Sequence, residues 1–198
     1  MIRSNIPVNR WLACTPTVDE ARPATCVGCG AASRPAGGRL RLHGHGLRDR
    51  QVRGPLSPGE KARTVTLPAR RYDCQCCPAV LLVVPCETMA RRHYMATAIA
   101  LALALYGVGQ QSHAEVRAAV SSDAVVGVSA ERRWCTLSRW IDAVAEGALF
   151  PAVPAMPDKL PRRAIAQRAA MAIGAHAPPS LPEGAPQLRA FVGAAQMP

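Results

Sequence analysis

Hydrophobic and polar positions alternate in two stretches of the first half of the chain. Leu40, Leu42 and Val52 alternate with polar residues in a partial period of two, and residues 64–72 resemble a strand that returns alongside them. A period of two places alternate side chains on the same face of a strand. Residues 54–59, between the two stretches, contain two prolines and two glycines, which is typical of a turn. The pattern therefore predicts a β-hairpin.

The pattern becomes helical after residue 87. Residues 88–106 are apolar on most faces and are followed by Gly107, so they predict a helix that ends there. Ser112 and Glu115 match a capping box, in which each side chain accepts a hydrogen bond from the other residue's free N–H group. This signal predicts a short second helix over residues 112–120.

A third helix is predicted over residues 129–146, because apolar residues recur there at spacings of three and four. This stripe consists of Trp134, Leu137, Ile141, Val144 and Ala148. From Pro151 onward prolines are frequent, and we expect one more helix over residues 158–174. Beyond His176 the composition favours a poorly ordered tail.

The basic residues are concentrated in the first half of the chain. The 198 residues have a net charge of +11, and residues 1–94 hold 15 Lys+Arg against 6 Asp+Glu. Residues 95–198 hold 9 against 7. A basic first half indicates a nucleic-acid partner, whereas a solvated basic face on a protein that binds another protein is the alternative.

Neither a membrane nor a secretory route is expected. The longest apolar stretch, residues 95–106, is much shorter than the roughly 20 residues of a bilayer-spanning helix. The N-terminus has no apolar run typical of a signal peptide. A cytoplasmic location is therefore expected. Cysteines stay reduced there, so that paired cysteines indicate a metal or catalysis before disulfides.

Two Cys-x-x-Cys pairs carry the clearest chemistry. Cys26 and Cys29 form the first pair, and Cys74 and Cys77 form the second. Each pair can bend around one Zn²⁺, and two pairs complete a closed tetrahedron. Gly30 suits the left-handed turn that such a knuckle requires. The sequence therefore predicts a structural Zn²⁺ site with these four cysteines as ligands.

Other ligand sets remain open at this point. Cys76 offers a third thiol in the second pair, and Cys86 is a substitute ligand. His43 and His45 are expected to face solvent or phosphate instead of the metal. A redox role would need a thioredoxin-like helix after the motif. A catalytic zinc would need an open coordination position, which four cysteines do not leave.

Basic and polar side chains that suit DNA occur in two places. The hairpin carries Arg48, Arg50, Arg70 and Arg71, whose guanidinium groups suit phosphates. The third helix carries residues that its apolar stripe leaves free to face outward and that are typical of base and phosphate contacts. These are Arg132, Arg133, Thr136, Ser138 and Arg139. A helix, a short capped helix and a longer helix also follow the order of a helix-turn-helix.

Several motifs together resemble the N-terminal part of bacterial insertion-sequence transposases. They are Cys26-x-x-Cys29-Gly30, His43-Gly-His-Gly-Leu-Arg48-Asp-Arg50, Arg70-Arg-Tyr-x-Cys74-x-x-Cys77, Val84-Pro85 and Arg92-His-Tyr94. The stretch Ser-x-x-Arg-Arg-Trp-x-x-Leu-x-x-Trp at residues 129–140 is similar to the DNA-binding helices of the same proteins. The resemblance covers about residues 20–150. It implies a zinc ribbon and a helix-turn-helix that bind the terminal repeats of a mobile element.

The resemblance does not extend to catalysis. Transposases of that kind cut DNA with three carboxylates that hold two Mg²⁺ ions on a β-sheet scaffold. The acids after residue 95 lie in helical or loop patterns. We therefore expect the DNA-binding part alone, without enzymatic activity, in an accessory protein, a regulator or a remnant.

The expected fold is α+β in three parts. Residues 1–87 form a small zinc-ribbon β-hairpin module, residues 88–150 an all-α helix-turn-helix bundle, and residues 151–198 a proline-rich segment with one helix. The expected partners are double-stranded DNA and a transposase or another mobile-element protein. The alternative function is a zinc-stabilised protein–protein adaptor in a transposition or transcription complex.

Overall fold

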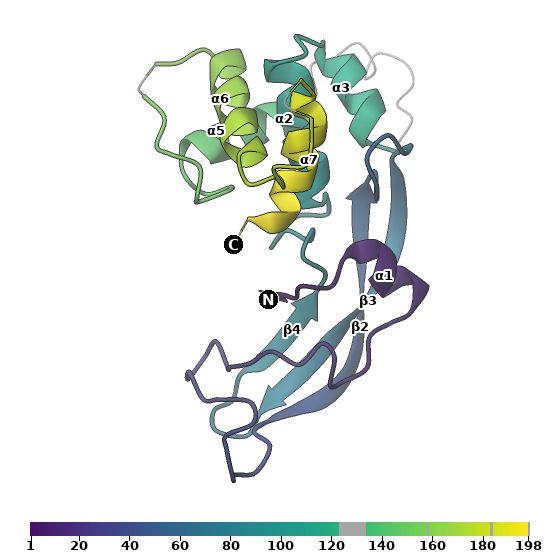
Figure 1. Cartoon of the computed structure of the whole chain (residues 1–198), viewed down its shortest axis with the longest axis vertical. Helices are drawn as coiled ribbons and strands as arrows, with labels where there is room; N and C mark the ends of the chain where they lie inside the picture. The colour runs from purple at the N-terminus through teal and green to yellow at the C-terminus, as the bar shows by residue number, and fades with distance from the viewer. Residues whose placement is uncertain (123–133, 158, 183, 198) are drawn as a thin grey trace. The chain divides into compact units, whose positions relative to one another are not determined.

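The computed structural model in Figure 1 describes residues 1–122, 134–157, 159–182 and 184–197. The strands are β1 (Ile2–Arg3), β2 (Leu42–Gly54), β3 (Arg63–Cys74) and β4 (Val80–Val84). The described helices are α1 (Val8–Ala13), α2 (Ala96–Gly107), α3 (His113–Val120), α5 (Cys135–Ala145), α6 (Arg162–Gly174) and α7 (Pro186–Gln196). Strands lie before residue 85 and all the longer helices after residue 95, which confirms the α+β class.

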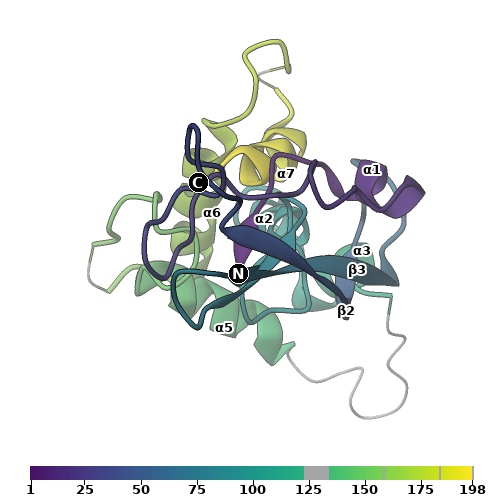
Figure 2. The same cartoon turned by 90° about the horizontal axis from the view of Figure 1, so that it is seen from below.

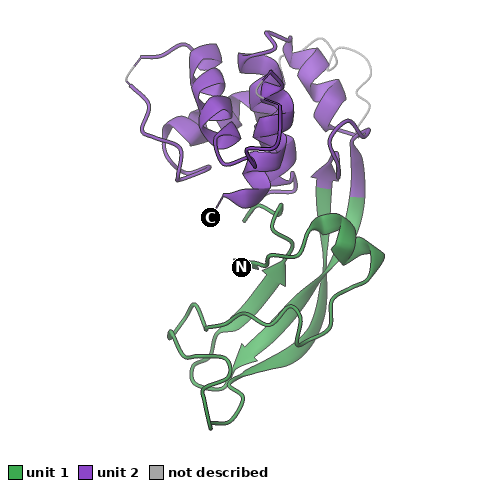
Figure 3. Cartoon of the chain, in the orientation of Figure 1, with its two compact units in different colours: residues 1–52, 65–91 green, residues 53–64, 92–198 purple. Residues whose placement is uncertain are grey.

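The chain divides into two compact units (Figure 3). Unit 1 consists of residues 1–52 and 65–91, and unit 2 of residues 53–64 and 92–198. The strands form one sheet in the order β1-β4-β3-β2. Strands β3 and β4 are antiparallel, with Arg70 opposite Val83 and Asp73 opposite Val80. The expected hairpin strands are therefore present as β2 and β3.

The N-terminal segment supplies much of the core of unit 1, although its sequence is weakly patterned. It runs alongside β3 (Figures 1 and 2). Trp11 is fully buried, and its indole N–H donates to the Pro68 carbonyl at 2.9 Å. The buried Tyr72 donates its hydroxyl to the Val18 carbonyl at 2.6 Å. The Arg22 guanidinium lies 5.6 Å from the centroid of the Tyr72 ring, a cation–π distance.

Helix α2 begins at Ala96, so the prediction of a helix from residue 88 is wrong at its start. The backbone just before Ala96 forms hydrogen bonds with the end of β2 instead. Arg53 donates its N–H to the His93 carbonyl at 2.8 Å and accepts from the Met95 N–H at 3.1 Å. This bridge holds Met95 in an extended conformation, which a helix cannot include.

Helix α2 forms the centre of unit 2. It packs against α3, α5, α6 and α7, and ten of its twelve residues are buried. The predicted capping box at the start of α3 is confirmed: Ser112 accepts from the Glu115 N–H at 3.3 Å, and Glu115 accepts from the Ser112 N–H at 2.7 Å. Gly107 permits close packing, because a Cβ there would lie 2.3 Å from the backbone nitrogen of Gln167 in α6.

Helix α5 confirms most of the predicted apolar stripe. Leu137, Ile141 and Val144 are buried, as is Trp134 just before the helix, whereas Ala148 is exposed because the helix ends at Ala145. The predicted start of this helix, residues 129–133, lies outside the described residues. The helix-turn-helix arrangement stays a prediction, since the connection from α3 to α5 lies there too.

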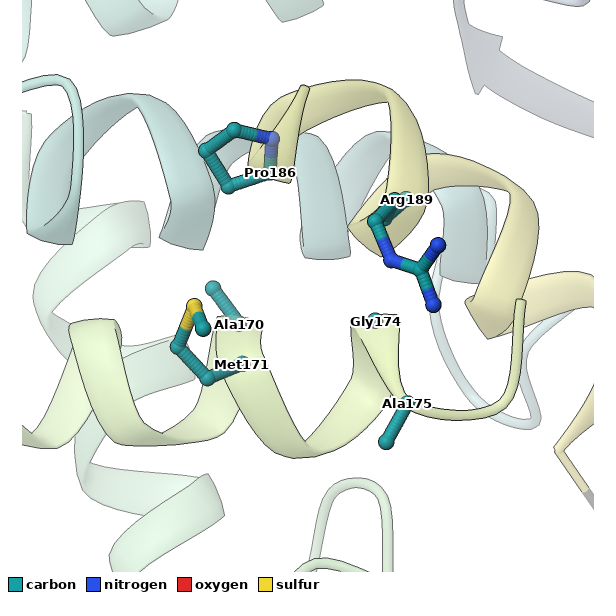
Figure 4. Close-up of a pocket in the computed structure, with 6 residues that line it drawn as sticks. All are labelled: Ala170, Met171, Gly174, Ala175, Pro186 and Arg189. Carbon is teal, nitrogen blue, oxygen red and sulfur yellow. The ribbon is translucent and has the colours of Figure 1, made fainter. Parts of the chain in front are cut away.

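The C-terminal segment holds two helices in place of the single one expected. Residues 186–196, expected as part of a poorly ordered tail, form α7, which packs on α2 and α6. Phe191 is buried, and Gly193 lies so close to α6 that a Cβ would be 2.1 Å from the Ile173 carbonyl oxygen. Small residues thus let α7 dock without a long apolar stripe. A groove of about 430 Å³ between α6 and α7 is lined by Met171 and Arg189, among others (Figure 4).

None of the described helices combines the length and the hydropathy needed to cross a membrane.

Candidate metal centre

The first cysteine knuckle follows the N-terminal segment of unit 1. The Cys26 N–H donates to the Ala31 carbonyl at 2.9 Å, and the Gly30 N–H donates to the Cys26 carbonyl at 2.8 Å. Gly30 has a φ of +72°, the left-handed conformation that its place after Cys29 predicts. These local bonds turn the chain sharply, so that both thiols of the pair point to the same side.

The second knuckle begins at the end of β3 and repeats the pattern of the first. The Cys74 N–H donates to the Ala79 carbonyl at 3.1 Å, so the acceptor again lies five residues after the first cysteine of the pair. The two knuckles are joined through Arg41. Its N–H donates to the Ser33 carbonyl at 2.9 Å, and its carbonyl accepts from the Gln75 N–H at 2.8 Å. Backbone contacts therefore bring together two stretches that lie far apart in the sequence.

The four predicted ligands come together as a compact cluster of sulfur atoms. The Sγ atoms of Cys26 and Cys77 are 3.7 Å apart, as are those of Cys29 and Cys74, and all four lie within 4.8 Å of one another. A tetrahedron with Zn–S bonds of ~2.3 Å has edges of ~3.8 Å. The cluster can therefore hold a metal ion, and it is the one such group among the residues that the structure describes.

Backbone N–H groups support the sulfurs. The Gly28 N–H donates to Cys26 Sγ at 3.3 Å, and the Cys76 N–H donates to Cys74 Sγ at 3.4 Å. The Cys76 N–H is the main reason why the pKa of Cys74 is lowered to about 6. Gly28 has little room for a side chain, because a Cβ would lie 3.0 Å from the Ala79 Cβ.

The thiols of Cys77 and Cys29 are harder to ionise than that of Cys74. The Ala79 N–H lowers the pKa of Cys77, but removal from water and the neighbouring thiols raise it more, to about 12. The pKa of Cys29 is raised in the same way, against the lowering effect of the Ala31 N–H. Four thiolates this close repel one another, and a bound cation offsets that repulsion.

The alternative ligands have other positions or other partners. Cys76 is exposed, and Cys86 lies outside the cluster with a pKa raised to about 12 by burial and by the Glu87 carboxylate. His43 Nε2 lies 3.0 Å from the Leu40 carbonyl. His45 Nδ1 lies 2.6 Å from a carboxylate oxygen of Asp73 in β3, so neither histidine joins the sulfurs.

The four predicted DNA-binding arginines of the hairpin differ in their exposure and in the hydrogen bonds that their guanidinium groups already make. Arg48 is exposed and Arg71 is half-buried in β3. Arg50 is half-buried and donates to the Met89 carbonyl at 2.7 Å, and burial lowers its pKa. Arg70 donates to the Pro16 carbonyl at 2.7 Å. Arg50 and Arg70 therefore hold the fold of unit 1 together, and only part of each guanidinium remains for a ligand.

The helical DNA-binding candidates divide in the same way. Arg139 is exposed and Thr136 is half-buried. Ser138 is only 9% exposed, so the expectation that it faces outward is wrong. It lies four residues after Trp134 and three before Ile141, which places it on the buried side of α5. Arg132 and Arg133 lie outside the described residues.

Charge pairing in unit 1 was not visible in the sequence. Unit 1 holds 11 Lys+Arg against five Asp+Glu. Asp19 pairs with both Arg22 and Arg34, and Glu20 pairs with Arg10 at 3.5 Å. Four exposed arginines of unit 1 make no side-chain hydrogen bond or ion pair with the part of the chain that the structure describes. These free arginines are Arg39, Arg41, Arg48 and Arg91, and the first three lie in or next to the hairpin.

Comparisons of the chain with models of known protein families, with curated proteins and with solved structures gave no match.

Proposed function

We propose that this chain is a non-catalytic zinc-binding protein that binds duplex DNA through unit 1. The observation that carries the proposal is the cluster of four sulfur atoms, whose spacing suits tetrahedral Zn²⁺. Four cysteines close the coordination sphere and leave no position for a substrate or a reactive water. The metal therefore has a structural role, and DNA binding belongs to the surface that the metal holds in shape.

The charge distribution of unit 1 supports DNA as the partner. Most of its carboxylates are engaged by partners within the unit, while Arg39, Arg41 and Arg48 stay exposed. Arg41 also joins the two knuckles through its backbone, so the metal fixes the base of this side chain. Guanidinium groups held in this way suit phosphate oxygens. They give an affinity that falls steeply with salt.

The resemblance to insertion-sequence transposases extends the proposal to a biological role. Its zinc-ribbon motifs lie in unit 1, around the four cysteines. An accessory protein or regulator that binds the terminal repeats of a mobile element fits this combination. A transposase of the same element is the protein partner that the resemblance suggests.

The proposal is tested by metal analysis followed by DNA-binding titrations. We expect one Zn²⁺ per chain and binding to a fluorescent duplex at low salt. A triple variant should reduce the slope of log K against log salt by about 2.7, because each lost phosphate contact removes ~0.9 from that slope. Its three changes are Arg39→Ala, Arg41→Ala and Arg48→Ala. Arg10→Ala is the matched control, because the charge of this exposed arginine is balanced by Glu20.

Two results would refute the DNA proposal. One is the absence of any duplex binding by the zinc-loaded protein at low salt. The other is equal affinity and equal salt dependence for the triple variant and the Arg10→Ala control. Arg139→Ala tests the separate prediction that α5 contributes a contact, with loss of affinity expected while the thermal melting curve stays unchanged.

A protein–protein adaptor is the second candidate function. The observation that favours it is a groove in unit 2 where α2 is reached from the surface at Leu101 and Leu105.

A further inference from the structure

A groove of about 590 Å³ lies within unit 2, between the turn that joins β2 to β3 and the helices α2 and α3. It is lined by Gly59, Glu60, Lys61, Ala62, Leu101, Leu105, Ala118, Ala119, Ser121 and Ser122. Neither the metal centre nor the free arginines of unit 1 contribute to it. Any role of the groove is therefore separate from the proposed DNA contact.

The floor of the groove is aliphatic. Leu101 and Leu105 are the two residues of α2 that are not buried, and they lie four residues apart on one face of the helix. Ala118 and Ala119 of α3 form a low wall, while Val116 and Val120 of the same helix are buried. The small alanines leave the two leucine side chains open to a ligand.

Side-chain hydrogen bonds hold the rim of the groove in place. Ser122 Oγ lies 2.9 Å from Thr64 Oγ1, which ties the segment after α3 to the second residue of β3. The Tyr94 hydroxyl donates to Ser121 Oγ at 2.9 Å. Two bonds from different parts of unit 2 thus fix the residues after α3. A groove formed in advance binds with a smaller loss of conformational entropy.

The rim carries a positive charge. Lys61 is exposed, and its side chain makes no hydrogen bond or ion pair within the described residues. Glu60, the one carboxylate among the described lining residues, lies 3.8 Å from Arg63 and is balanced by it. Lys61 and Arg63 together thus outnumber Glu60 at this end of the groove. Charge complementarity therefore favours an acidic ligand.

We infer that this groove binds an acidic segment of another protein, which places two aliphatic side chains against Leu101 and Leu105. An amphipathic helix with aliphatic residues one turn apart matches the spacing of the two leucines. A second copy of this chain is disfavoured, because its net charge of +11 repels a cationic rim. DNA is disfavoured as well, since phosphates and sugars do not complement an aliphatic floor.

The test measures the fluorescence anisotropy of a labelled synthetic peptide with two leucines four residues apart and glutamates at its other positions. The zinc-loaded full-length chain should bind this peptide about tenfold more tightly than a peptide with glutamine in place of both leucines. Ala118→Glu should weaken binding by about tenfold or more, because it adds a like charge at the wall. Ala114→Glu is the matched control: Ala114 is exposed on the same helix but outside the lining, and its variant should bind as the wild type does.

Three outcomes decide against the inference. Equal binding of the leucine and glutamine peptides would mean that charge alone attracts the ligand. Equal binding by the Ala118→Glu and Ala114→Glu variants, with matching melting curves, would place the site elsewhere. Displacement of the peptide by a short DNA duplex would assign the groove to DNA. If duplex binding fails but the peptide result holds, the DNA proposal alone is refuted.

Discussion

Removal of the metal should unfold unit 1 and leave the helices of unit 2 in place. Structural Zn²⁺ contributes an apparent ~10–16 kcal/mol in small metal-bound domains. The net stability of a domain is only about 5–15 kcal/mol. The four cysteines of the cluster lie in the N-terminal segment and at the end of β3, so loss of a bound ion would free both from the same point. Unit 1 is therefore expected to be unstable without its ion.

The size of the effect on secondary structure follows from where the helices lie. Among the described residues, unit 1 contains the six residues of α1, whereas unit 2 contains helices of 12, 8, 11, 13 and 11 residues. Because α1 is about a tenth of these helical residues, chelation should remove no more than about a tenth of the helical signal in circular dichroism. Hydrogen exchange in β3 and β4 should rise to the rate of an unfolded chain at the same time.

Two cysteine variants make this prediction specific. Cys74→Ser removes a ligand and should reproduce the effect of chelation. Cys76→Ser is the matched control, because its exposed thiol lies two residues away and outside the sulfur cluster. The reasoning is refuted if the metal-free protein keeps slow exchange in β3. It is equally refuted if Cys76→Ser loses the metal and Cys74→Ser retains it.

Three further predictions concern stability. Gly107→Ala should destabilise the protein by about 1–3 kcal/mol despite the better helix propensity of alanine, because the new Cβ meets the Gln167 backbone at 2.3 Å. Gly174→Ala, whose nearest contact would be 3.4 Å, should be nearly neutral in the same thermal melts, and a reversed order would contradict this packing. Arg163→Met should lower the free energy of unfolding by about 1–3 kcal/mol, because the Arg163 guanidinium donates to two backbone carbonyls and lies 4.3 Å from a tyrosine ring. Urea unfolding measures this change, and an unchanged midpoint concentration of urea would argue against it. Burial raises the pKa of Glu87 in the folded protein above its value in the unfolded chain. The folded state therefore favours the protonated carboxyl group, whose contribution to stability is fully present below the unfolded pKa. That contribution is lost as the pH rises through the folded pKa. Unfolding measured between pH 4 and 7 should therefore show a smaller loss of stability for Glu87→Gln than for the wild type, and parallel curves would exclude this role.

Some features could be predicted from the sequence because they depend on residues close together in the chain. Each Cys-x-x-Cys knuckle is held by backbone bonds within a few residues, and the capping box of α3 spans four. The apolar stripe of α5 depends in the same way on a spacing of three and four. These local signals indicated the cysteine cluster, which could hold a metal ion, and the α+β class without knowledge of the packing.

Tertiary structure decided the features that depend on partners far apart in the sequence. Arg50 and Arg70 look like free cations in the sequence, but the Met89 and Pro16 carbonyls engage them. The start of α2 depends on the end of β2, some 40 residues earlier in the chain. Helix α7 has small residues in place of a strong apolar stripe, and its close packing against α2 and α6 explains its stability. A backbone carbonyl or a neighbouring helix carries no signature in the sequence of its distant partner, and for that physical reason these features required the fold.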